Sequence, residues 1–493
     1  MKTSRRDFIK ASAVAGAGFL VASGNFRKQA RASALESVAV AGVGVGGKGG
    51  GDITHAGYYG KVVALCDVDT NTLEGKKHNE FKDAKTFVDY RDMYAEMMDK
   101  IDAVTVGTPD HMHAIITAAA IKAGKHVYTQ KPLTRTIYEA RWLGELAKKH
   151  GVCTQMGNQG SVDDGLRKTA AQYRAGVVGE VKEVHVWTNR PIWPQGKNRT
   201  MTLDRFVKKT REEVEDEEEA NELIEEKKLE IAKALKTVNW DAWIGVAPKR
   251  EFWPGDYHSF KWRGWWDFGT GALGDMACHN VNMIFKAVDL RNPTSVCAKS
   301  SGHDFDSFPA SSTTEFEFPA NDWRGPIKFV WYDAAQTPPA ELTSKYGFDK
   351  VDGGGGCFVI GDKGAGLGND FRAEGGKKID PIPEDQTEFV IAPIDDQGRG
   401  DDARHKFEWF NAIWDNKPDL CWSNFPNHAG PLTETILLGN LSIWTAAEGQ
   451  GEKVEWDAKN LKVTNLAELK TPHVADLVKP VYQNGYEPID ELF

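Results

Sequence analysis

The sequence has few cysteines, no long apolar run and no excess of positive charge. Its 6 cysteines are scattered over 493 residues, and no pair has the CxxC spacing of a zinc ribbon or a redox motif. Past the N-terminal segment, no stretch approaches the ~20 consecutive apolar residues of a membrane span. The net charge of −10 argues against nucleic-acid binding, which needs clustered lysine and arginine. The hydrophobic content of 41% is ordinary, so we expect a soluble globular chain of two or three domains.

Residues 1–34 have the pattern of an export signal. Arg5 and Arg6 precede an uncharged stretch rich in alanine and glycine at 11–23, and a small-residue site follows at 32–34. This order is typical of a cleaved signal peptide, and the apolar part is too short for a stable membrane anchor. The segment SRRDFIK closely resembles a twin-arginine (Tat) signal. The resemblance implies recognition by the Tat export machinery, export of an already folded protein to the periplasm, and no anchor after cleavage.

A glycine-rich turn follows the first apolar run of the mature chain. In GVGVGG, Gly42, Gly44 and Gly47 fit G-x-G-x-x-G. The first glycine permits a tight turn, the second lets the backbone approach a pyrophosphate, and the third lets helix and strand pack closely. A second apolar run at 62–66 ends at Asp67, whose carboxylate can accept hydrogen bonds from ribose hydroxyls and would repel a 2′-phosphate. The pattern therefore predicts a dinucleotide site that prefers NAD to NADP.

Further strands and helices alternate along the N-terminal part. We expect strands at 103–106 and 126–129 and helices at about 114–123 and 136–150. This alternation predicts a parallel, doubly wound sheet, in which a ligand lies outside the carboxyl ends of the strands. Three polar residues fall at such ends, namely Asp67, Thr108 and Lys131.

The motifs GVGVGG, TPDHMH and QKP, followed later by GDMACH, occur in an order and spacing that resemble the glucose–fructose oxidoreductase, inositol dehydrogenase and rhizopine-catabolism (Gfo/Idh/MocA) family. The resemblance covers essentially the whole mature chain. It implies an α/β protein with a Rossmann domain at 35–157, followed at 158–493 by an α/β domain with a large, open, mostly antiparallel sheet. That sheet often forms an oligomer interface, so a homodimer or homotetramer is expected. The family commonly has Glu-Lys-Pro, whereas this chain has Gln130 in place of the glutamate.

The resemblance also implies a catalytic set made of Lys131, Asp275 and His279. Asp275 and His279 are four residues apart, so on a helix they share one face. Oxidation of an alcohol needs a base with a pKa near neutrality, which favours His279 as general base. Lys131 can stabilise developing alkoxide charge and relay a proton, and Asp275 can orient these groups.

The expected cofactor is NAD, and no metal is expected, although His111 and His113 are close in sequence. The expected cofactor contacts are Gly42, Gly44, Gly46, Gly47, Asp67, Thr108, Pro109, His113, Gln130, Lys131 and Gln159. Large flat rings suit both the apolar faces of sugars and any protein core. The candidates for a sugar pocket are Asn189, Arg190, Trp193, Trp262 and Arg263.

More than half of the 34 residues in the segment 203–236 are charged, with 12 acids and 8 bases. A thin apolar stripe within it predicts one or two solvated helices. The sequence leaves three alternatives for this insertion: it forms oligomer contacts, it covers a pocket as a lid, or it has no role.

Three functions are compatible with these motifs. The first is NAD-dependent oxidation of a hydroxyl group on a sugar, glycoside or polyol, with tightly bound cofactor recycled in place. The second is an NAD-dependent glycosidase or lyase that acts through a transient keto-sugar, which export favours because free NAD is scarce outside the cytoplasm. The third is a non-catalytic sugar- or NAD-binding protein, and the presence of Lys131, Asp275 and His279 argues against it.

Overall fold

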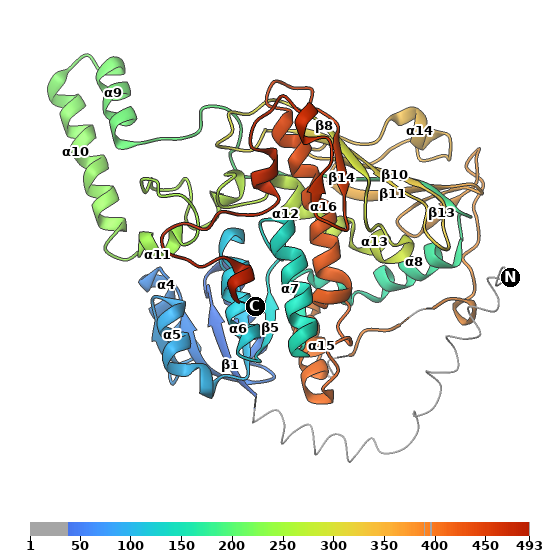
Figure 1. Ribbon diagram of the computed structural model, residues 1–493, viewed down its shortest axis with the longest axis horizontal. Coiled ribbons are helices and arrows are strands. Elements are labelled where there is room, and N and C mark those ends of the chain that lie inside the picture. The colour runs from blue at the N-terminus through green and yellow to red at the C-terminus, as the bar shows by residue number, and fades with distance from the viewer. Residues whose placement is uncertain (1–37, 389, 395–396, 493) are drawn as a thin grey trace.

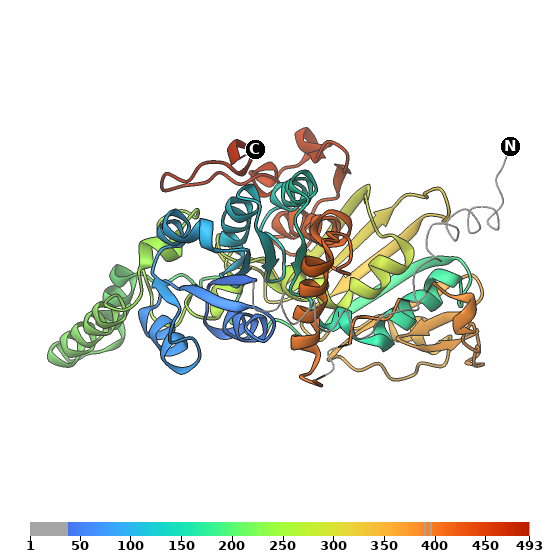
Figure 2. The ribbon, with the colours of Figure 1, turned by 90° about the horizontal axis from the view of Figure 1, so that it is seen from below.

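The computed structural model describes residues 38–388, 390–394 and 397–492. The expected signal segment at 1–34 lies outside these residues. The chain forms two sheets, one of six and one of nine strands, which lie side by side (Figures 1 and 2). Among the helices of the described residues, none is both long and apolar enough to cross a membrane.

The N-terminal sheet is parallel, with strand order β3-β2-β1-β4-β5-β6. Its strands are β1 (Ala39–Val43), β2 (Lys61–Cys66), β3 (Lys85–Phe87), β4 (Ala103–Val106), β5 (His126–Thr129) and β6 (Thr154–Met156). The connecting helices are α3 (Gly47–Ala56), α4 (Thr70–Asn79), α5 (Tyr90–Met97), α6 (Asp110–Lys122) and α7 (Ile137–His150). The strand order reverses between β1 and β4, which creates the crevice in which such sheets bind ligands. The predicted doubly wound sheet is confirmed.

The second sheet has the order β13-β12-β11-β7-β10-β9-β8-β14-β15. Its strands are β7 (Val181–Thr188), β8 (Ser295–Ser300), β9 (Ser312–Phe318), β10 (Ile327–Tyr332), β11 (Gly355–Gly361), β12 (Ala365–Leu367), β13 (Asp370–Arg372), β14 (Val454–Asp457) and β15 (Lys462–Val463). Strands β7 and β10 pair in parallel, whereas the other described pairs are antiparallel. The expected large, mostly antiparallel sheet is confirmed.

Helices cover one face of the second sheet (Figures 1 and 2). They are α8 (Asp164–Ala175), α12 (Gly271–Asn280), α13 (Asn282–Val288) and α16 (Gly430–Thr445). The alternation of side chains along the strands fits this arrangement, because Phe316 and Phe329 are buried in the core, whereas Glu315 and Lys328 point outward and form an ion pair. Short helix α14 (Ala340–Ser344) lies near one end of this domain (Figure 1).

One helix from the C-terminal part of the chain completes the N-terminal domain. Helix α15 (Asp401–Asp415) places Trp409 and Phe410 in the same apolar cluster as Val40 and Ile53. All strands of the Rossmann sheet therefore lie before the expected boundary at 157, but the core of this domain also includes residues of α15.

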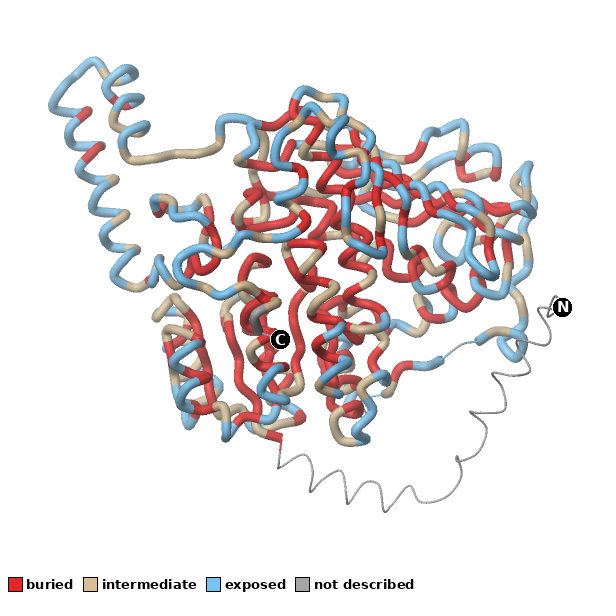
Figure 3. Tube along the Cα trace, viewed as in Figure 1, coloured by how far each residue is buried: buried red, intermediate tan, exposed pale blue. Residues whose placement is uncertain are grey.

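The charged insertion forms two helices, α9 (Leu203–Glu213) and α10 (Glu217–Ala234), which project from the molecule (Figure 1). Most of their residues are exposed (Figure 3). Asp216 caps α10 by accepting a hydrogen bond from the Glu219 amide. Acidic residues in the first turn also stabilise the helix, because their negative charge lies at the positive end of its dipole. Local sequence, rather than burial, therefore accounts for much of the stability of this hairpin.

The chain after α10 is bonded directly to the Rossmann domain. The Thr70 amide donates to the Thr237 carbonyl at 2.9 Å, and the Asn239 amide donates to the Val68 carbonyl at 2.8 Å. Helix α11 (Trp240–Ile244) follows at once. The second domain is thus fixed beside the carboxyl end of β2, where Asp67 lies.

Candidate active site

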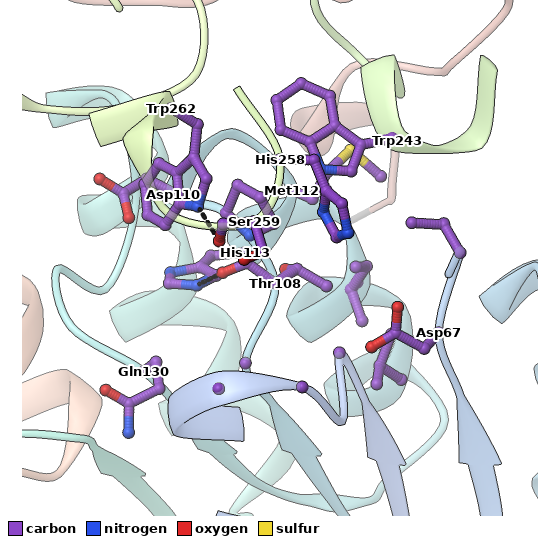
Figure 4. Close-up of a pocket in the computed structure, with 18 of the residues that line it drawn as sticks. Asp67, Thr108, Asp110, Met112, His113, Gln130, Trp243, His258, Ser259 and Trp262 are labelled. Atoms are coloured by element: carbon purple, nitrogen blue, oxygen red, sulfur yellow. Dashed lines mark hydrogen bonds between the residues drawn. The ribbon is translucent and has the colours of Figure 1, made fainter. Parts of the chain in front are cut away.

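A cavity of about 240 Å³ lies between the two domains at the carboxyl ends of the Rossmann strands (Figure 4). One wall is formed by the glycine loop after β1 and the loops after β2, β4 and β5. The opposite wall is formed by aromatic and basic residues of the second domain, and Tyr486 of the C-terminal segment also contributes. We refer to this cavity as the cleft.

The glycine loop approaches its neighbours so closely that side chains are excluded. A Cβ on Gly44, which has φ +74°, would lie 2.7 Å from the Gly107 carbonyl carbon. The prediction that Gly47 lets helix and strand pack closely is wrong, because a Cβ there would meet nothing within 4 Å. Gly49 has that role instead, since its Cβ would fall 2.0 Å from the Gly44 oxygen. Gly47 is constrained by its φ of +47° at the start of α3, whose free amides favour an anion such as a pyrophosphate.

Asp67 is held in place by backbone amides at the end of β2. Its carboxylate accepts hydrogen bonds from the Val45 amide at 2.8 Å and from the Asp69 amide at 3.0 Å. Burial raises the pKa of Asp67, although both amide bonds act in the opposite direction. The side chain lines the cleft beside Gly46, a position that suits hydrogen bonding to ribose hydroxyls.

Thr108 and Pro109 also line the cleft, on the loop after β4. The Thr108 hydroxyl is buried and has no hydrogen-bond partner among the described residues, so a polar ligand group is expected there. Together with the glycine loop and Asp67, this orphaned hydroxyl fits a dinucleotide such as NAD.

The two histidines of the TPDHMH motif contact backbone oxygens. His113 lines the cleft, and its ring nitrogens lie 2.7 Å from the Thr108 oxygen and 2.8 Å from the Pro132 oxygen. His111 contacts the Trp243 oxygen at 3.0 Å. Burial lowers the pKa of His111 to about 3 and that of His113 to about 4, so both are neutral. Across the described ranges, no cluster of three or more histidine, cysteine or acidic side chains could hold a metal ion.

Gln130 replaces the family's glutamate and is explained by its neighbours. It lines the cleft, but its amide nitrogen donates to Asp52 Oδ2 at 2.6 Å. The other oxygen of Asp52 accepts from Lys406 Nζ at 2.7 Å, and both members of this ion pair are fully buried. Burial lowers the pKa of Lys406 to about 8, although Asp52 opposes this shift. A donor is therefore required beside Asp52, and a glutamate could not supply one while ionised.

Gln159 points away from the cleft in this structure. Its amide nitrogen donates to the Tyr128 hydroxyl at 3.0 Å, and the residue is absent from the cleft lining. Its expected contact with the cofactor stays a prediction.

The structure brings Lys131 and Asp275 together across the domain boundary. Lys131 Nζ donates to Asp275 Oδ1 at 2.5 Å and to the Asp275 carbonyl oxygen at 2.9 Å. Arg263 Nε donates to the same carboxylate oxygen at 3.1 Å. Burial raises the pKa of Asp275, but Lys131 and Arg263 together outweigh burial and leave it below its usual value. Asp275 is therefore ionised, and its carboxylate holds the Lys131 ammonium and the Arg263 guanidinium in place.

His279 lies one turn after Asp275 on α12 and is half-buried. Burial, assisted by the Lys131 charge, lowers the pKa of His279 to about 3. No residue in the described part of the chain forms a hydrogen bond with the ring. Neither His279 nor Asp275 is among the residues that line the cleft, and the Lys131–Asp275 pair connects their helix to the cleft wall.

The five expected sugar-pocket residues do not lie together. Trp262 and Arg263 line the cleft. Trp193 is buried, and its ring packs 6.0 Å from that of Phe260. Asn189 and Arg190 line a separate hollow of about 420 Å³, with Met276 and Asn280 of α12. The expectation of one shared pocket is wrong for these residues, because β7 delivers Asn189 and Arg190 to another face of α12.

Several cleft residues were not expected from the sequence. Trp243 and His258 of the second domain line the cleft (Figure 4). His258 Nε2 lies 3.0 Å from Asp69 Oδ2 across the cleft rim. No local motif marks them, because tertiary folding brings them there. Asp110 also lines the cleft, and its place directly after the loop at the end of β4 was a usable signal.

Comparison with known proteins agrees with this geometry. A family model described as "Oxidoreductase family, NAD-binding Rossmann fold" matches residues 37–158, and one described as "Oxidoreductase family, C-terminal alpha/beta domain" matches residues 222–318. Both are models of Gfo/Idh/MocA domains, and they occur here in the order expected for that family. The chain belongs to the Gfo/Idh/MocA oxidoreductase family, and its first domain is an NAD-binding domain.

Curated relatives match parts of the chain. Inositol 2-dehydrogenase of Salmonella typhimurium is 28% identical over 127 residues, which are 25% of this chain and 37% of that protein. An uncharacterized oxidoreductase of Bacillus subtilis is 30% identical over 152 residues, 28% of this chain and 39% of that protein. A glycosyl hydrolase family 109 protein of Solibacter usitatus is 30% identical over 174 residues, 32% of this chain and 39% of that protein. The chain thus spans less than two fifths of the length of each.

Solved structures resemble nearly the whole fold. The aldose-aldose oxidoreductase from Caulobacter crescentus is 15% identical with a TM-score of 0.51, over 85% of this chain and 100% of that one. An inositol dehydrogenase homolog from Azotobacter vinelandii, complexed with NADH and myo-inositol, is 16% identical with a TM-score of 0.51, over 85% and 98%. At these identities the likeness establishes the fold alone.

Proposed function

We propose that the protein catalyses NAD-dependent oxidation of a hydroxyl group on a sugar, glycoside or polyol. The observation that carries this proposal is the ion pair between Lys131 and Asp275, with the free ring of His279 nearby, beside a cleft that fits a dinucleotide. The similarity to an inositol 2-dehydrogenase supports the choice of a polyol-like substrate.

NAD, when bound, supplies the acceptor for the hydride that leaves the carbinol carbon. The protein must bind the alcohol and accept the proton of its hydroxyl group. Lys131 has three N–H groups, and Asp275 accepts two of them through its side chain and its carbonyl. The third is free among the described contacts and can donate to the reacting oxygen, where it stabilises alkoxide charge. His279, neutral and unpaired, accepts the hydrogen bond of the same hydroxyl.

The walls of the cleft suit a sugar-like molecule. Trp243 and Trp262 contribute flat apolar surfaces, which match the apolar faces of a ring. Arg263 and Lys131 contribute donors for hydroxyl oxygens near the reacting centre.

A second candidate is an NAD-dependent glycosidase or lyase that acts through a transient keto-sugar. The similarity to a glycosyl hydrolase family 109 protein favours it. In this reaction the ring hydroxyl would lose its proton to His279 and its carbon a hydride to NAD, with Lys131 stabilising the oxygen. A proton would then leave the carbon beside the new carbonyl as the glycosidic bond breaks and the aglycone departs. Water would add in place of the aglycone, and the hydride would return to the carbonyl carbon.

The proposal includes location, cofactor retention and assembly. The twin arginine at Arg5 and Arg6 supports Tat export to the periplasm, where a bound NAD must be recycled in place. The contact of His258 with Asp69 across the cleft rim supports slow cofactor release. A homodimer or homotetramer is the assembly we expect from the open second sheet.

One experiment separates the candidate functions. Purified protein is incubated with free sugars, polyols and chromogenic glycosides without added NAD. Reduced nicotinamide formed from a free sugar or polyol supports the dehydrogenase, and aglycone release without net reduction supports the glycosidase. Bound NAD with neither signal on any substrate would contradict both and leave a binding protein.

A further inference from the structure

A segment near the C-terminus, residues 474–490, runs from the second domain to the Rossmann domain (Figures 1 and 2). Val474 and Ile489 are buried in the core, so the segment is anchored at both ends. Between them, the Tyr482 hydroxyl donates to Glu139 Oε1 of α7 at 2.7 Å. We refer to residues 474–490 as the strap, and the proposed chemistry does not use it.

The strap is also bonded to the loop after α11. The Gln483 amide donates to the Val246 carbonyl at 3.0 Å. Asn484 Nδ2 donates to the carbonyl oxygens of the residues on either side of Val246, at 2.8 Å and 2.9 Å. Helix α11 carries Trp243, which lines the cleft, so these hydrogen bonds hold the strap against the second-domain wall of the cleft.

Tyr486 follows two residues after Asn484 and lines the cleft. Its ring is half-buried, and the ring centre lies 5.0 Å from the guanidinium carbon of Arg91 on α5, which is within the range of a cation–π contact. Arg91 is itself paired with Asp89, the N-cap residue of α5. The Tyr486 ring is therefore positioned by Arg91 on the Rossmann side and by the strap on the other side.

Tyr486 lies at the end of the cleft that contains Asp67. The Asp67 amide donates to the carbonyl of Phe87, the last residue of β3, at 3.1 Å. The loop after β3 is thus beside Asp67, and its residues 88–90 line the cleft. Arg91, which contacts the Tyr486 ring, follows them directly. The strap therefore reaches the edge of the sheet at which β2 and β3 end.

We propose that Tyr486 binds the adenine ring of NAD and that the strap closes the adenosine end of the cleft. A ribose bonded to Asp67 is one glycosidic bond from its base, so the adenine falls among the lining residues around Asp67. The Tyr486 ring offers that base an aromatic surface on which to stack. This inference concerns the cofactor alone and goes beyond the proposed oxidation. The strap then contributes to the retention of NAD.

Tyr486→Ala tests the proposal through the release of NADH. Protein loaded with NADH is mixed with an excess of NAD, and the decay of the bound NADH fluorescence gives the dissociation rate. Loss of one base-stacking ring should make release about 5- to 150-fold faster. Tyr486→Phe keeps the ring and should release NADH at the parent rate. Tyr486→Leu keeps an apolar side chain without a ring, and it should also release NADH faster, which preserves the test if the alanine variant does not fold.

Tyr58→Ala is the matched control. Tyr58 is 45% exposed, and its ring also lies near an arginine, with the Arg399 guanidinium carbon 4.6 Å from the ring centre, but it does not line the cleft. This control should release NADH at the parent rate. Equally fast release from Tyr58→Ala and Tyr486→Ala would overturn the proposal.

Fragments of the dinucleotide separate a direct contact with adenine from a general loosening of the strap. ADP-ribose contains the adenosine half of NAD, whereas reduced nicotinamide mononucleotide lacks it. In nucleotide-free protein, Tyr486→Ala should weaken the binding of ADP-ribose by the same factor as that of NADH and leave the binding of the mononucleotide unchanged. Release of NADH within a factor of about two of the parent rate, or equal losses of affinity for both fragments, would overturn the assignment. A parent protein that oxidises no sugar or polyol would contradict the proposed function, but it would leave these binding results and the assignment in force.

Discussion

Gln130→Glu is the substitution that restores the residue common in the family, and we expect it to destabilise this protein. The amide nitrogen of Gln130 lies 2.6 Å from Asp52 Oδ2. A glutamate would place two carboxylate oxygens at that distance, both shielded from water. Lys406 already pairs with the other oxygen of Asp52 and cannot neutralise a second charge.

The loss of stability is set by whichever costs less free energy: leaving both carboxylates ionised, or protonating one of them. Two full charges 2.6 Å apart repel by about 6 kcal/mol at an effective dielectric constant of about 20. Keeping one carboxyl protonated at pH 7, against an ordinary pKa of about 4.3, costs about 4 kcal/mol. Protonation is cheaper, so the folded-state pKa of the new acid is raised.

The sign of the pH dependence is then fixed. Because the new acid has a raised pKa in the folded state, the variant loses free energy of unfolding relative to the parent. This loss is absent below the unfolded-state pKa of about 4.3 and grows by about 1.4 kcal/mol per pH unit above it. The variant should therefore be about 1 kcal/mol less stable than the parent at pH 5 and about 4 kcal/mol less stable at pH 7.

Urea unfolding between pH 5 and pH 7, followed by tryptophan fluorescence, measures this difference. Trp409 is a suitable reporter, since its ring lies 5.8 Å from that of Tyr128 in the same core. Gln159→Glu is the control, because that side chain faces a tyrosine hydroxyl rather than a carboxylate. Parallel pH curves for Gln130→Glu and the parent would refute the explanation given for Gln130.

Three further predictions concern the cofactor, the chemistry and export. Asp67→Ala should weaken NAD binding by about 1–3 kcal/mol through lost buried hydrogen bonds, measured by calorimetry, and unchanged affinity would remove Asp67 from the ribose site. His279→Ala and Lys131→Ala should each lower turnover by about 10²–10⁴-fold while bound NAD is retained. Their double variant should lose less than the product of the single effects, since both groups act on one oxygen, and strictly multiplicative losses would contradict this. Replacing Arg5 and Arg6 by lysine should leave the protein in the cytoplasm, and normal periplasmic recovery would exclude the Tat route.

The sequence predicted what local motifs encode. Strand–helix alternation predicted the parallel N-terminal sheet, and the family resemblance predicted the mostly antiparallel sheet that follows it along the chain. The position of Asp67 at a strand end, and the shared helix face of Asp275 and His279, follow from spacing alone. The meeting of Lys131 with Asp275 followed from the family pattern, and the structure places them 2.5 Å apart.

What could not be predicted depends on tertiary packing. The importance of Gly49 emerges only when helix α3 is placed against the loop that contains Gly107. Arg190 is as polar as Arg263, but the two lie on different sides of α12, and only the folded chain decides which one reaches the cleft. The departure at Gln130 has its cause in Asp52, 78 positions earlier, which needs a hydrogen-bond donor at the oxygen that Lys406 does not reach.

The position of α15 has a consequence for biosynthesis. Lys406 and Asp52 are separated by 354 positions along the chain, yet they form a fully buried pair beneath the nucleotide-binding helix. A nascent chain emerging from a ribosome exposes the six parallel strands early, but it must wait for α15 to cover Ile53 and neutralise Asp52. The domain that is translated first is therefore among the last to be finished, and an isolated fragment that ends at residue 157 would keep an uncompensated charge and an open apolar surface.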